Sequence, residues 1–335
     1  MTMIKAYAAY EAGEPLAEIL YDAGAIDPHE VEIAVESCGL CHSDLAMINN
    51  DWRASQYPLV AGHEVIGRIT ALGSHVKHLE LGQMVGVGWN SHSCMHCSPC
   101  LSGRQQRYQD LTITVLGRGG FADHIRVQDI WAVPLPKGID AKSAGPLFCG
   151  GITVFAPLLD YGVKPTDKVG VIGIGGLGHL ALQMTRAWGC EVTAFTSSAD
   201  KINELKGFGA HHVVNSRDKV AVHALRGKFD FILSTVDVKL PWNRYMSALA
   251  PEGQLITVGM VKEPMAISAG ALISGQKSVG GSDTGSPDIV AKMLEFCVRH
   301  DIKPMVEYFP MSDINAAIKH LESGKARYRV VLTND

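Results

Sequence analysis

The sequence predicts a two-domain α/β protein in which a β-rich domain accompanies a doubly wound parallel sheet of six strands. In the first ~150 residues, short β-like runs alternate with turn residues, as in antiparallel domains. From Lys168 to Asp283, apolar strands alternate with helical patterns instead. A chain of 335 residues is long enough for two domains. We expect residues 1–150 and 285–335 to form one domain and residues 151–284 the other.

The β-rich domain is predicted from the runs "EVEIAVESCG", "HEVIGRITALG" and "QMVGVGW", which turn residues separate at short intervals. This pattern favours an antiparallel, partly barrelled sheet. Near the chain end, "IVAKMLEFCVRH" and "DINAAIKHLESG" read as helices, the second with Asp313 as a candidate cap. The final run "YRVVLTND" is expected to be a strand that returns to this domain.

The second domain is predicted from strands that regularly alternate with helices, which indicates a parallel sheet. The first helix, "LGHLALQMTRAWG", closes at Gly189. The other predicted helices are "ADKINELKGFG", "DKVAVHALRG" and "PWNRYMSALA". The six predicted strands are "KVGVIGIG", "EVTAFT", "HHVVN", "FDFILSTV", "GQLITVG" and "KSVGGSD".

Composition excludes several classes of protein. The net charge is −4, with acidic and basic residues intermixed, so neither a nucleic-acid nor a membrane surface is expected. No apolar run reaches the ~20 residues of a membrane span, and the N-terminus lacks the order of a signal peptide. We therefore expect a cytoplasmic protein, whose eight cysteines are metal ligands or core residues rather than disulfides.

A dinucleotide fingerprint, G-x-G-x-x-G, follows the first strand of the second domain as Gly173, Gly175 and Gly178. Gly173 permits a tight turn, Gly175 lets the backbone approach a pyrophosphate, and Gly178 allows the helix to pack closely. Gly176 and Leu177 complete the turn, and the helix N-terminus offers amide hydrogens to phosphate. Although a glycine-rich turn alone is weak support, the surrounding periodicity favours a Rossmann-type cofactor domain.

The second strand lacks the acidic residue that normally binds the ribose hydroxyls of NAD. It ends in hydroxyl side chains, at Thr196, Ser197 and Ser198, and Lys201 follows. Hydroxyls and a lysine suit the 2′-phosphate of NADP. Asp200 argues for NAD, but we expect it to lie beyond the turn as a helix cap. The sequence therefore predicts NADP(H).

Two cysteine motifs point to metal. Cys94, Cys97 and Cys100 recur every three residues, a spacing typical of a loop that wraps zinc. Cys38 and Cys41 form a C-x-x-C pair, for which a redox role is the alternative to metal binding.

Five segments together give the chain a family resemblance over essentially its whole length. The chain resembles the zinc-dependent medium-chain alcohol dehydrogenases, in the branch of cinnamyl alcohol dehydrogenases and bacterial broad-range aldehyde reductases. That resemblance implies a GroES-like catalytic domain beside the Rossmann-type domain. The segments are "CGLCHSDL", "PLVAGHEVIGRI", "AGPLFCGGITVF", "GVIGIGGLGHLA" and "GKARYRVVL".

The resemblance places one catalytic Zn²⁺ on Cys41, His63 and Cys149, leaving an open fourth position for substrate. Glu64 resembles the family's carboxylate near that metal. Buried, inert cysteines and histidine are the alternative for each residue taken singly. Cys38 is not a ligand in the family, so we expect it to be structural.

The resemblance also suggests roles in the reaction. Ser43 matches the family's proton-relay hydroxyl, but the relay histidine of many relatives is Ala46 here. The relay must then end through the cofactor ribose and water, or through His42, which we expect instead near the cofactor phosphates. Thr153 follows the third zinc ligand and is a further cofactor-binding candidate.

Trp52 and Trp89 are candidates for an apolar substrate pocket that would favour aromatic or aliphatic aldehydes over polyols. Core packing is an equally good interpretation of these two tryptophans.

The three-cysteine loop departs from the family, in which a fourth cysteine completes a structural zinc site. That position is Tyr108 here, and a phenol is a poor zinc ligand near neutral pH. Three interpretations stay open: a zinc held by three thiolates plus Asp110 or water, an empty loop, or a disulfide formed by oxidation.

The sequence thus predicts an enzyme that transfers hydride between NADPH and aldehydes or primary alcohols with the help of zinc. The family implies a homodimer formed through the sheet edge of the cofactor domain. The alternatives are an NAD-dependent zinc polyol dehydrogenase and a non-catalytic dinucleotide-binding sensor.

Overall fold

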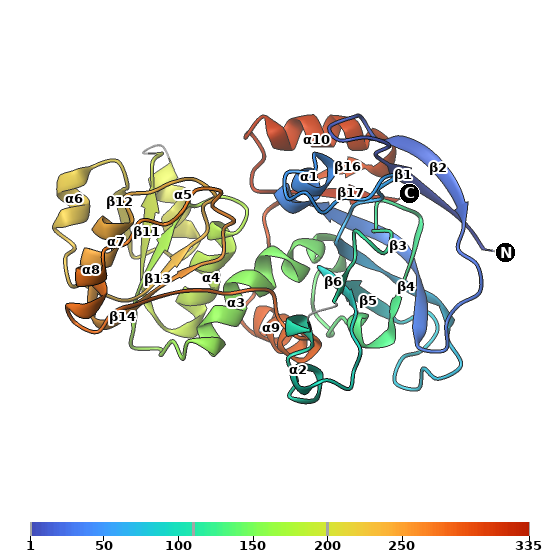
Figure 1. The fold of residues 1–335 in the computed structure, drawn as a ribbon, viewed down its shortest axis with the longest axis horizontal. Helices are drawn as coiled ribbons and strands as arrows, with labels where there is room; N and C mark the ends of the chain where they lie inside the picture. Colours follow the sequence, from blue (N-terminus) through green and yellow to red (C-terminus); the bar gives the residue numbers. More distant parts are fainter. Residues whose placement is uncertain (1, 109–110, 199–200, 335) are drawn as a thin grey trace. The chain divides into compact units, whose positions relative to one another are not determined.

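The computed structural model describes residues 2–108, 111–198 and 201–334. It contains two compact units (Figure 1). The β-rich unit comprises the chain up to Ile152 together with the part from Thr284 onward, and the parallel-sheet unit comprises Thr153–Asp283. The predicted fold class, a β-rich domain plus a doubly wound parallel sheet, is confirmed.

The β-rich unit is built around a seven-stranded sheet of order β16-β17-β3-β4-β5-β9, in which β8 also pairs with β3. Every pairing is antiparallel except that of β16 with β17. The predicted return of the C-terminal strand is confirmed, because β17 pairs with β3. The strands are β3 (Glu30–Leu40), β4 (Glu64–Leu72), β5 (Met84–Val87), β8 (His124–Gln128), β9 (Val133–Pro134), β16 (Val306–Pro310) and β17 (Arg329–Thr333).

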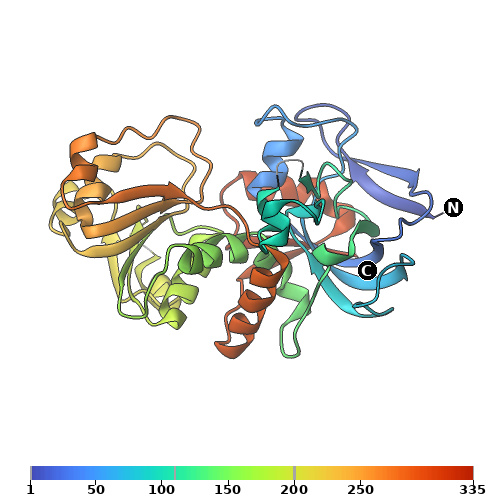
Figure 2. The same cartoon turned by 60° about the horizontal axis from the view of Figure 1, so that its bottom comes forward.

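Two small two-stranded sheets and several helices complete this unit. The sheets pair β1 (Met3–Ala8) with β2 (Ala17–Asp22), and β6 (Asn90–His92) with β7 (Thr112–Ile113). Helix α9, orange-red in Figure 2, is amphipathic and buries its apolar side chains. Asp313 stands at the start of α10 as predicted, but its side chain makes no capping hydrogen bond. The α-helices are α1 (His42–Ile48), α2 (Ser98–Leu101), α9 (Pro287–Arg299) and α10 (Ile314–Glu322).

Short 3₁₀ turns carry the connections of the β-rich unit. One of them, η4, leads directly to Cys149 and then into helix α3 (Gly150–Asp160). The 3₁₀ turns are η1 (Gln105–Arg107), η2 (Asp129–Trp131), η3 (Ala141–Ser143), η4 (Gly145–Phe148) and η6 (Met311–Asp313).

The parallel-sheet unit contains the six predicted strands, all parallel, in the order β12-β11-β10-β13-β14-β15. Helix α4 lies on one side of these strands, and α6, α7 and α8 lie on the other (Figure 1). The strands are β10 (Lys168–Ile172), β11 (Glu191–Thr196), β12 (His212–Asn215), β13 (Phe229–Ser234), β14 (Leu249–Thr257) and β15 (Ser278–Gly281). The helices are α4 (Gly178–Trp188), α5 (Ile202–Gly207), α6 (Lys219–His223), α7 (Trp242–Ala248) and α8 (Ala269–Ile273).

Helix α4 ends as the sequence predicts. Gly189 caps it in the left-handed conformation, with φ of 111°, which a residue with a Cβ rarely adopts. Within the residues that the structure describes, no helix has the length and apolarity needed to cross a bilayer.

Candidate active site and metal centres

One cluster of potential metal ligands lies deep in the β-rich unit. The ligand atoms of Cys41, His63, Glu64 and Cys149 all lie within 4.8 Å of one another. The Sγ atoms of Cys41 and Cys149 are 3.9 Å apart. Two thiolates bound to one tetrahedral zinc at about 2.3 Å would lie about 3.8 Å apart. The thiol spacing therefore fits a shared zinc ion and is far too long for a disulfide.

Strand pairing brings these residues together. Cys41 follows the last residue of β3, and His63 immediately precedes β4, which pairs with β3 so that Gly39 lies opposite Glu64. Turn η4 then delivers Cys149 to the same place. Its close approach depends on Gly145, because a Cβ there would lie 2.6 Å from the backbone oxygen of Glu64.

The orientation of His63 is set by Asp44, on the first turn of α1. Asp44 Oδ1 accepts hydrogen bonds from His63 Nδ1 and from the Gly62 amide, each at 2.8 Å. Its other oxygen accepts one from the Cys41 amide at 2.9 Å. Because Nδ1 is engaged, Nε2 presents its lone pair, and it is buried without a hydrogen-bond partner among the described residues. A buried, unpartnered Nε2 beside two thiols is what a zinc ligand requires.

Asp44 was not among the candidate site residues in the sequence, and its role as the partner of His63 was missed. A usable signal was present: an acid three residues after Cys41, at the start of α1, is the pattern of a capping box.

A buried arginine, Arg329, was also missed. It opens the C-terminal strand β17 and forms an ion pair with Glu64, while its Nη1 lies 3.9 Å from Cys41 Sγ. Burial raises the pKa of Glu64 to about 7, although Arg329 pulls it the other way. A hydrogen bond with Cys149 lowers the pKa of the Cys41 thiol well below its ordinary value, and Arg329 also favours the thiolate. Arg329 thus offsets the negative charge of the cluster.

The two tryptophans proposed for the substrate pocket lie beside this cluster. The rings of Trp89 and His63 meet edge to face with centroids 4.7 Å apart, and Trp52 meets Trp89 in the same way at 5.9 Å. Both tryptophans are only partly buried. A cavity of about 20 Å³ is lined by Trp89 and by Phe148, the residue before Cys149. The two tryptophans therefore lie next to the candidate metal ligands, and their role in a substrate pocket stays a prediction.

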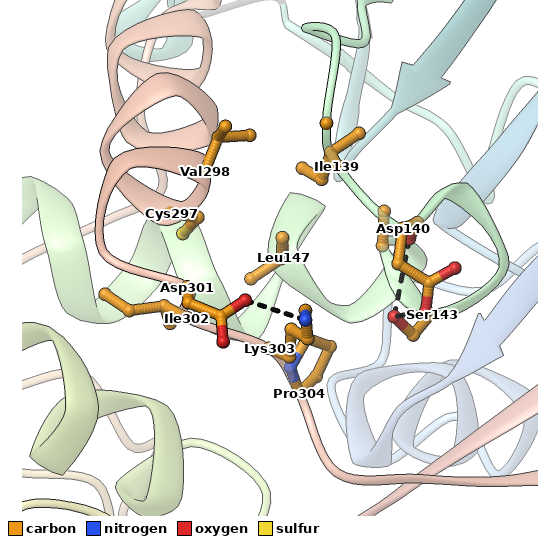
Figure 3. Close-up of a pocket in the computed structure, with 12 residues that line it drawn as sticks. Ile139, Asp140, Ser143, Leu147, Cys297, Val298, Asp301, Ile302, Lys303 and Pro304 are labelled. Carbon is orange, nitrogen blue, oxygen red and sulfur yellow. Dashed lines mark hydrogen bonds and ion pairs between the residues drawn. The ribbon is translucent and has the colours of Figure 1, made fainter.

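A second cavity of similar size lies elsewhere in the β-rich unit, near the end of α9 (Figure 3). Leu147 and Cys297 give it an apolar floor. The charged side chains at its rim are already paired: Lys303 with Asp301 at 2.7 Å, and Asp140 with Ser143 at 2.6 Å. None of its lining residues is a candidate metal ligand, so we do not place the substrate there.

Helix α1 places the proposed relay residues directly after Cys41. His42 is exposed and Ser43 is partly buried, both on the first turn, while Ala46 is buried and offers no polar group. The assignment of Ser43 to proton transfer and of His42 to the cofactor stays a prediction.

The fingerprint glycines of the parallel-sheet unit have distinct steric roles. Gly173 has φ of 87°, and a Cβ there would lie 2.4 Å from Val236 Cγ1. A Cβ on Gly178 would lie 2.0 Å from the Gly173 carbonyl oxygen. Around Gly175, by contrast, nothing lies within 4 Å of where a Cβ would be, which leaves open space above the backbone. The turn thus fits a pyrophosphate at the N-terminus of α4.

The remaining cofactor candidates have different settings. Thr196, at the end of β11, is buried and its Oγ1 accepts a hydrogen bond from the Ser198 amide at 3.1 Å, so this hydroxyl shapes the turn. Ser197 is exposed and Ser198 partly buried, and Lys201 stands at the start of α5. Asp200, the acidic residue that would favour NAD, lies outside the described residues.

Three candidate residues of the nucleotide site remain to be placed. Gly176 and Leu177 lie in the turn before α4, and Thr153 is partly buried on α3. Their contacts with a cofactor stay predictions.

The three-cysteine loop brings its thiols together around α2. The ligand atoms of Cys94, Cys97 and Cys100 lie within 4.8 Å of one another, and Cys94 and Cys100 are 3.9 Å apart. All three are free thiols. Tyr108 is partly buried, and Asp110 lies outside the described residues. In the described part of the chain, this group contains three ligands of the His, Cys, Asp or Glu type rather than the four of a closed zinc site.

Known proteins match both units. Residues 27–137 match the family described as "Alcohol dehydrogenase GroES-like domain", and residues 176–299 match "Zinc-binding dehydrogenase". The aldehyde reductase AdhA of Synechocystis sp. is 56% identical, over 99% of this chain and 99% of the relative.

Two solved structures share the fold over the whole length. A cinnamyl alcohol dehydrogenase from Sorghum bicolor superposes with a TM-score of 0.95 at 34% identity, covering 99% of this chain and 98% of that one. A protein of Helicobacter pylori described as CAD, solved in complex with NADP(H), gives a TM-score of 0.91 at 29% identity, with the same coverage.

The β-rich unit contains a cluster of thiols and an imidazole, and the other unit is a parallel sheet of the dinucleotide-binding type. These features define a zinc-type medium-chain dehydrogenase, and the chain belongs to that family. Within the family it belongs to the branch of cinnamyl alcohol dehydrogenases and aldehyde reductases, as the sequence motifs predicted. The chain is therefore an oxidoreductase of the alcohol dehydrogenase and aldehyde reductase class.

Proposed function

We propose that the protein is a zinc- and NADP-dependent reductase of aromatic and aliphatic aldehydes, which also oxidises the corresponding primary alcohols. The observation that carries this proposal is the buried, unpartnered Nε2 of His63 beside the thiols of Cys41 and Cys149. These three side chains would hold one zinc ion. When bound, zinc would act as a Lewis acid that polarises the carbonyl oxygen of the aldehyde.

The protein's own residues prepare that site. Asp44 fixes the ring of His63 so that Nε2 faces the thiols. Arg329 places a buried positive charge beside Cys41 and Glu64, which favours the thiolate. Ser43, on the first turn of α1, is proposed to donate the proton that the reduced oxygen requires. Since Ala46 cannot extend the relay, we propose that the proton arrives from the cofactor ribose and water.

The preference for NADP(H) is proposed from the hydroxyl-bearing end of β11. Ser197 and Ser198 stand where an NAD-binding site carries an acidic residue, and Lys201 adds a cation. The Helicobacter pylori relative, solved with NADP(H), supports the same choice.

This preference is tested by comparing the Kd of NADPH and NADH for the unaltered protein and for Lys201→Ala. A charge-assisted contact with phosphate contributes on the order of 1.5–3 kcal/mol, so NADPH binding should weaken about 10- to 100-fold. Lys206→Ala, on the same helix, is the matched control and should leave both constants unchanged. Equal affinity of the unaltered protein for the two cofactors would contradict the proposal.

The substrate class is proposed from the two tryptophans beside His63, which offer an apolar wall rather than partners for many hydroxyl groups. The name of the Synechocystis relative describes aldehyde reduction, and an apolar substrate pocket agrees with that activity. The protein should oxidise NADPH in the presence of benzaldehyde faster than it oxidises sorbitol. A chelator should abolish the reaction with benzaldehyde. Turnover of sorbitol with NAD alone would favour a polyol dehydrogenase, and the absence of turnover by the zinc-loaded protein would favour a sensor.

We also propose a homodimer that forms through the exposed edge of strand β15. Val279 is 38% exposed on β15, the last strand in the sheet order, and an edge strand of this kind can pair with the same strand of a second copy. Light scattering should give a dimer for the unaltered protein and a monomer for Val279→Lys.

We place the protein in the cytoplasm, because all eight cysteines are free thiols, as in a reducing compartment.

A further inference from the structure

We propose that Arg217, just beyond the end of the strand next to β11, is a second cation of the site that binds the 2′-phosphate of NADP(H). This inference rests on the proposed preference for NADP(H) and adds a specificity-determining residue that the sequence patterns did not indicate. It comes from the order of the strands in the sheet, because Arg217 is separated from Lys201 by a helix and a strand along the chain.

Strand pairing places Arg217 beside the hydroxyl-bearing end of β11. Strands β11 and β12 are parallel neighbours, and their last paired residues are Thr196 and Asn215. The contact continues one residue further, because the Ser216 amide donates to the Thr196 carbonyl oxygen at 2.9 Å. Ser197 and Ser216, the first residues after the two strands, therefore leave the same edge of the sheet side by side, and Arg217 follows Ser216 directly.

This edge is where a doubly wound sheet binds its ligand. In open parallel sheets, cofactors bind outside the carboxyl ends of the strands. Arg217 follows the carboxyl end of β12, just as Ser197 and Ser198 follow that of β11. Lys201 approaches the same end of β11 through the turn, since its amide lies 3.5 Å from the Ser198 carbonyl oxygen. Two basic residues, each from a different connection between strands, thus lie at the sheet edge that carries this group of hydroxyls.

The side chain of Arg217 is exposed and has no hydrogen bond or ion pair with any other part of the chain that the structure describes. Its backbone is nevertheless fixed, because its amide donates to Asn215 Oδ1 at 3.0 Å. The acid that follows, Asp218, is engaged elsewhere: its Oδ1 accepts from the amides of Val220 and Ala221 at the start of α6. A guanidinium on a fixed backbone, not neutralised by its acidic neighbour, is available to an anion.

The chemistry of arginine suits a phosphate monoester. A guanidinium offers a planar fork of donors that binds two phosphate oxygens at once, whereas a lysine acts as a point charge. The same group could instead stack on the adenine ring. Stacking would contribute equally to NADPH and NADH, whereas phosphate binding contributes to NADPH alone. The two roles can therefore be distinguished by measurement.

The test compares Arg217→Gln with Arg226→Gln by titrating each protein with NADPH and with NADH and following tryptophan fluorescence. Arg226 belongs to the same connection but precedes β13, so it lies at the opposite, amino edge of the sheet. We expect Arg217→Gln to weaken NADPH binding about 10- to 100-fold, as for loss of a charge-assisted contact, and NADH binding less than about twofold. Arg226→Gln should change neither constant.

Two further measurements complete the test. Arg217→Lys should recover part of the NADPH affinity, because it restores charge without the fork. The dependence of NADPH binding on salt should also become weaker in Arg217→Gln. Thermal melting should be the same in all variants, which would show that the sheet is intact.

Some outcomes would overturn the inference. If Arg217→Gln weakened the binding of NADPH and NADH equally, Arg217 would contact the adenine and not the phosphate. If both dissociation constants were unchanged, Arg217 would be a surface residue without a role in cofactor binding. If instead the unaltered protein bound both cofactors equally well, the proposed NADP(H) preference itself would be wrong. The failure of the inference is thus distinguishable from the failure of the proposed function.

Discussion

The substitution Asp44→Asn should loosen the proposed catalytic zinc without unfolding the protein. The Asp44 carboxylate is completely buried and accepts three hydrogen bonds, from the amides of Cys41 and Gly62 and from His63 Nδ1. Asparagine has the same shape, but one carboxylate oxygen becomes an NH₂ group that cannot accept. At least one of the three donors must then lose its partner, and His63 loses the negative charge that favours Nδ1–H.

The size of the effect follows from these contacts. A hydrogen bond to a charged group contributes about 1.5–3 kcal/mol, so losing one acceptor should lower the free energy of unfolding by about that amount. Loss of the partner that orients a metal-binding histidine typically lowers metal affinity about 10- to 100-fold. We therefore expect the zinc Kd of Asp44→Asn to rise by that factor, while the cofactor Kd stays the same.

The assay is a competition for zinc between the protein and a chromogenic chelator, with cofactor titration and thermal melting alongside. Asp288→Asn is a suitable control, because Asp288 is exposed and pairs with Lys292 on α9 at 2.7 Å, far along the chain from the proposed zinc ligands. That control should keep the zinc affinity of the unaltered protein. If Asp44→Asn also kept it, within about twofold, the orientation of His63 by Asp44 would not matter for metal binding, and the reasoning would be refuted.

Three further predictions concern the other sites. Cys149→Ser should remove the tightly held catalytic zinc and most activity while the protein still folds, and metal analysis with circular dichroism would reveal any other result. Tyr108→Cys should add one tightly held zinc per chain and raise the melting temperature, because it completes four thiolates; unchanged metal content would mean that the loop geometry does not suit zinc. Gly178→Ala should lower the melting temperature, because its Cβ would lie 2.0 Å from the Gly173 carbonyl oxygen, whereas Gly175→Ala should leave melting unchanged and weaken cofactor binding. Equal melting temperatures for these two glycine variants would contradict the steric argument.

Local patterns in the sequence were sufficient for much of the fold. The six strands of the parallel sheet were predicted in order, because alternation of strand and helix periodicity is a property of neighbouring residues. The conformation of Gly189 at the end of α4 was predictable for the same reason. Cys41, His63 and Cys149 were selected by motifs that resemble a family, and the structure brings their ligand atoms together. Whether they hold the catalytic zinc stays a prediction.

Other features depend on residues that are distant in sequence. Arg329 meets Glu64 only because β17 joins the sheet next to β3, across 265 positions of the chain. Trp89 contacts His63 only after β4 and β5 have paired. Arg217 leaves the same sheet edge as the hydroxyl-bearing end of β11 because β12 is the neighbour of β11, an order that no local pattern states. The sequence by itself therefore determined the elements and the types of ligand, whereas the tertiary structure decided which charges and rings surround them, because strand order and register are set by packing between distant segments.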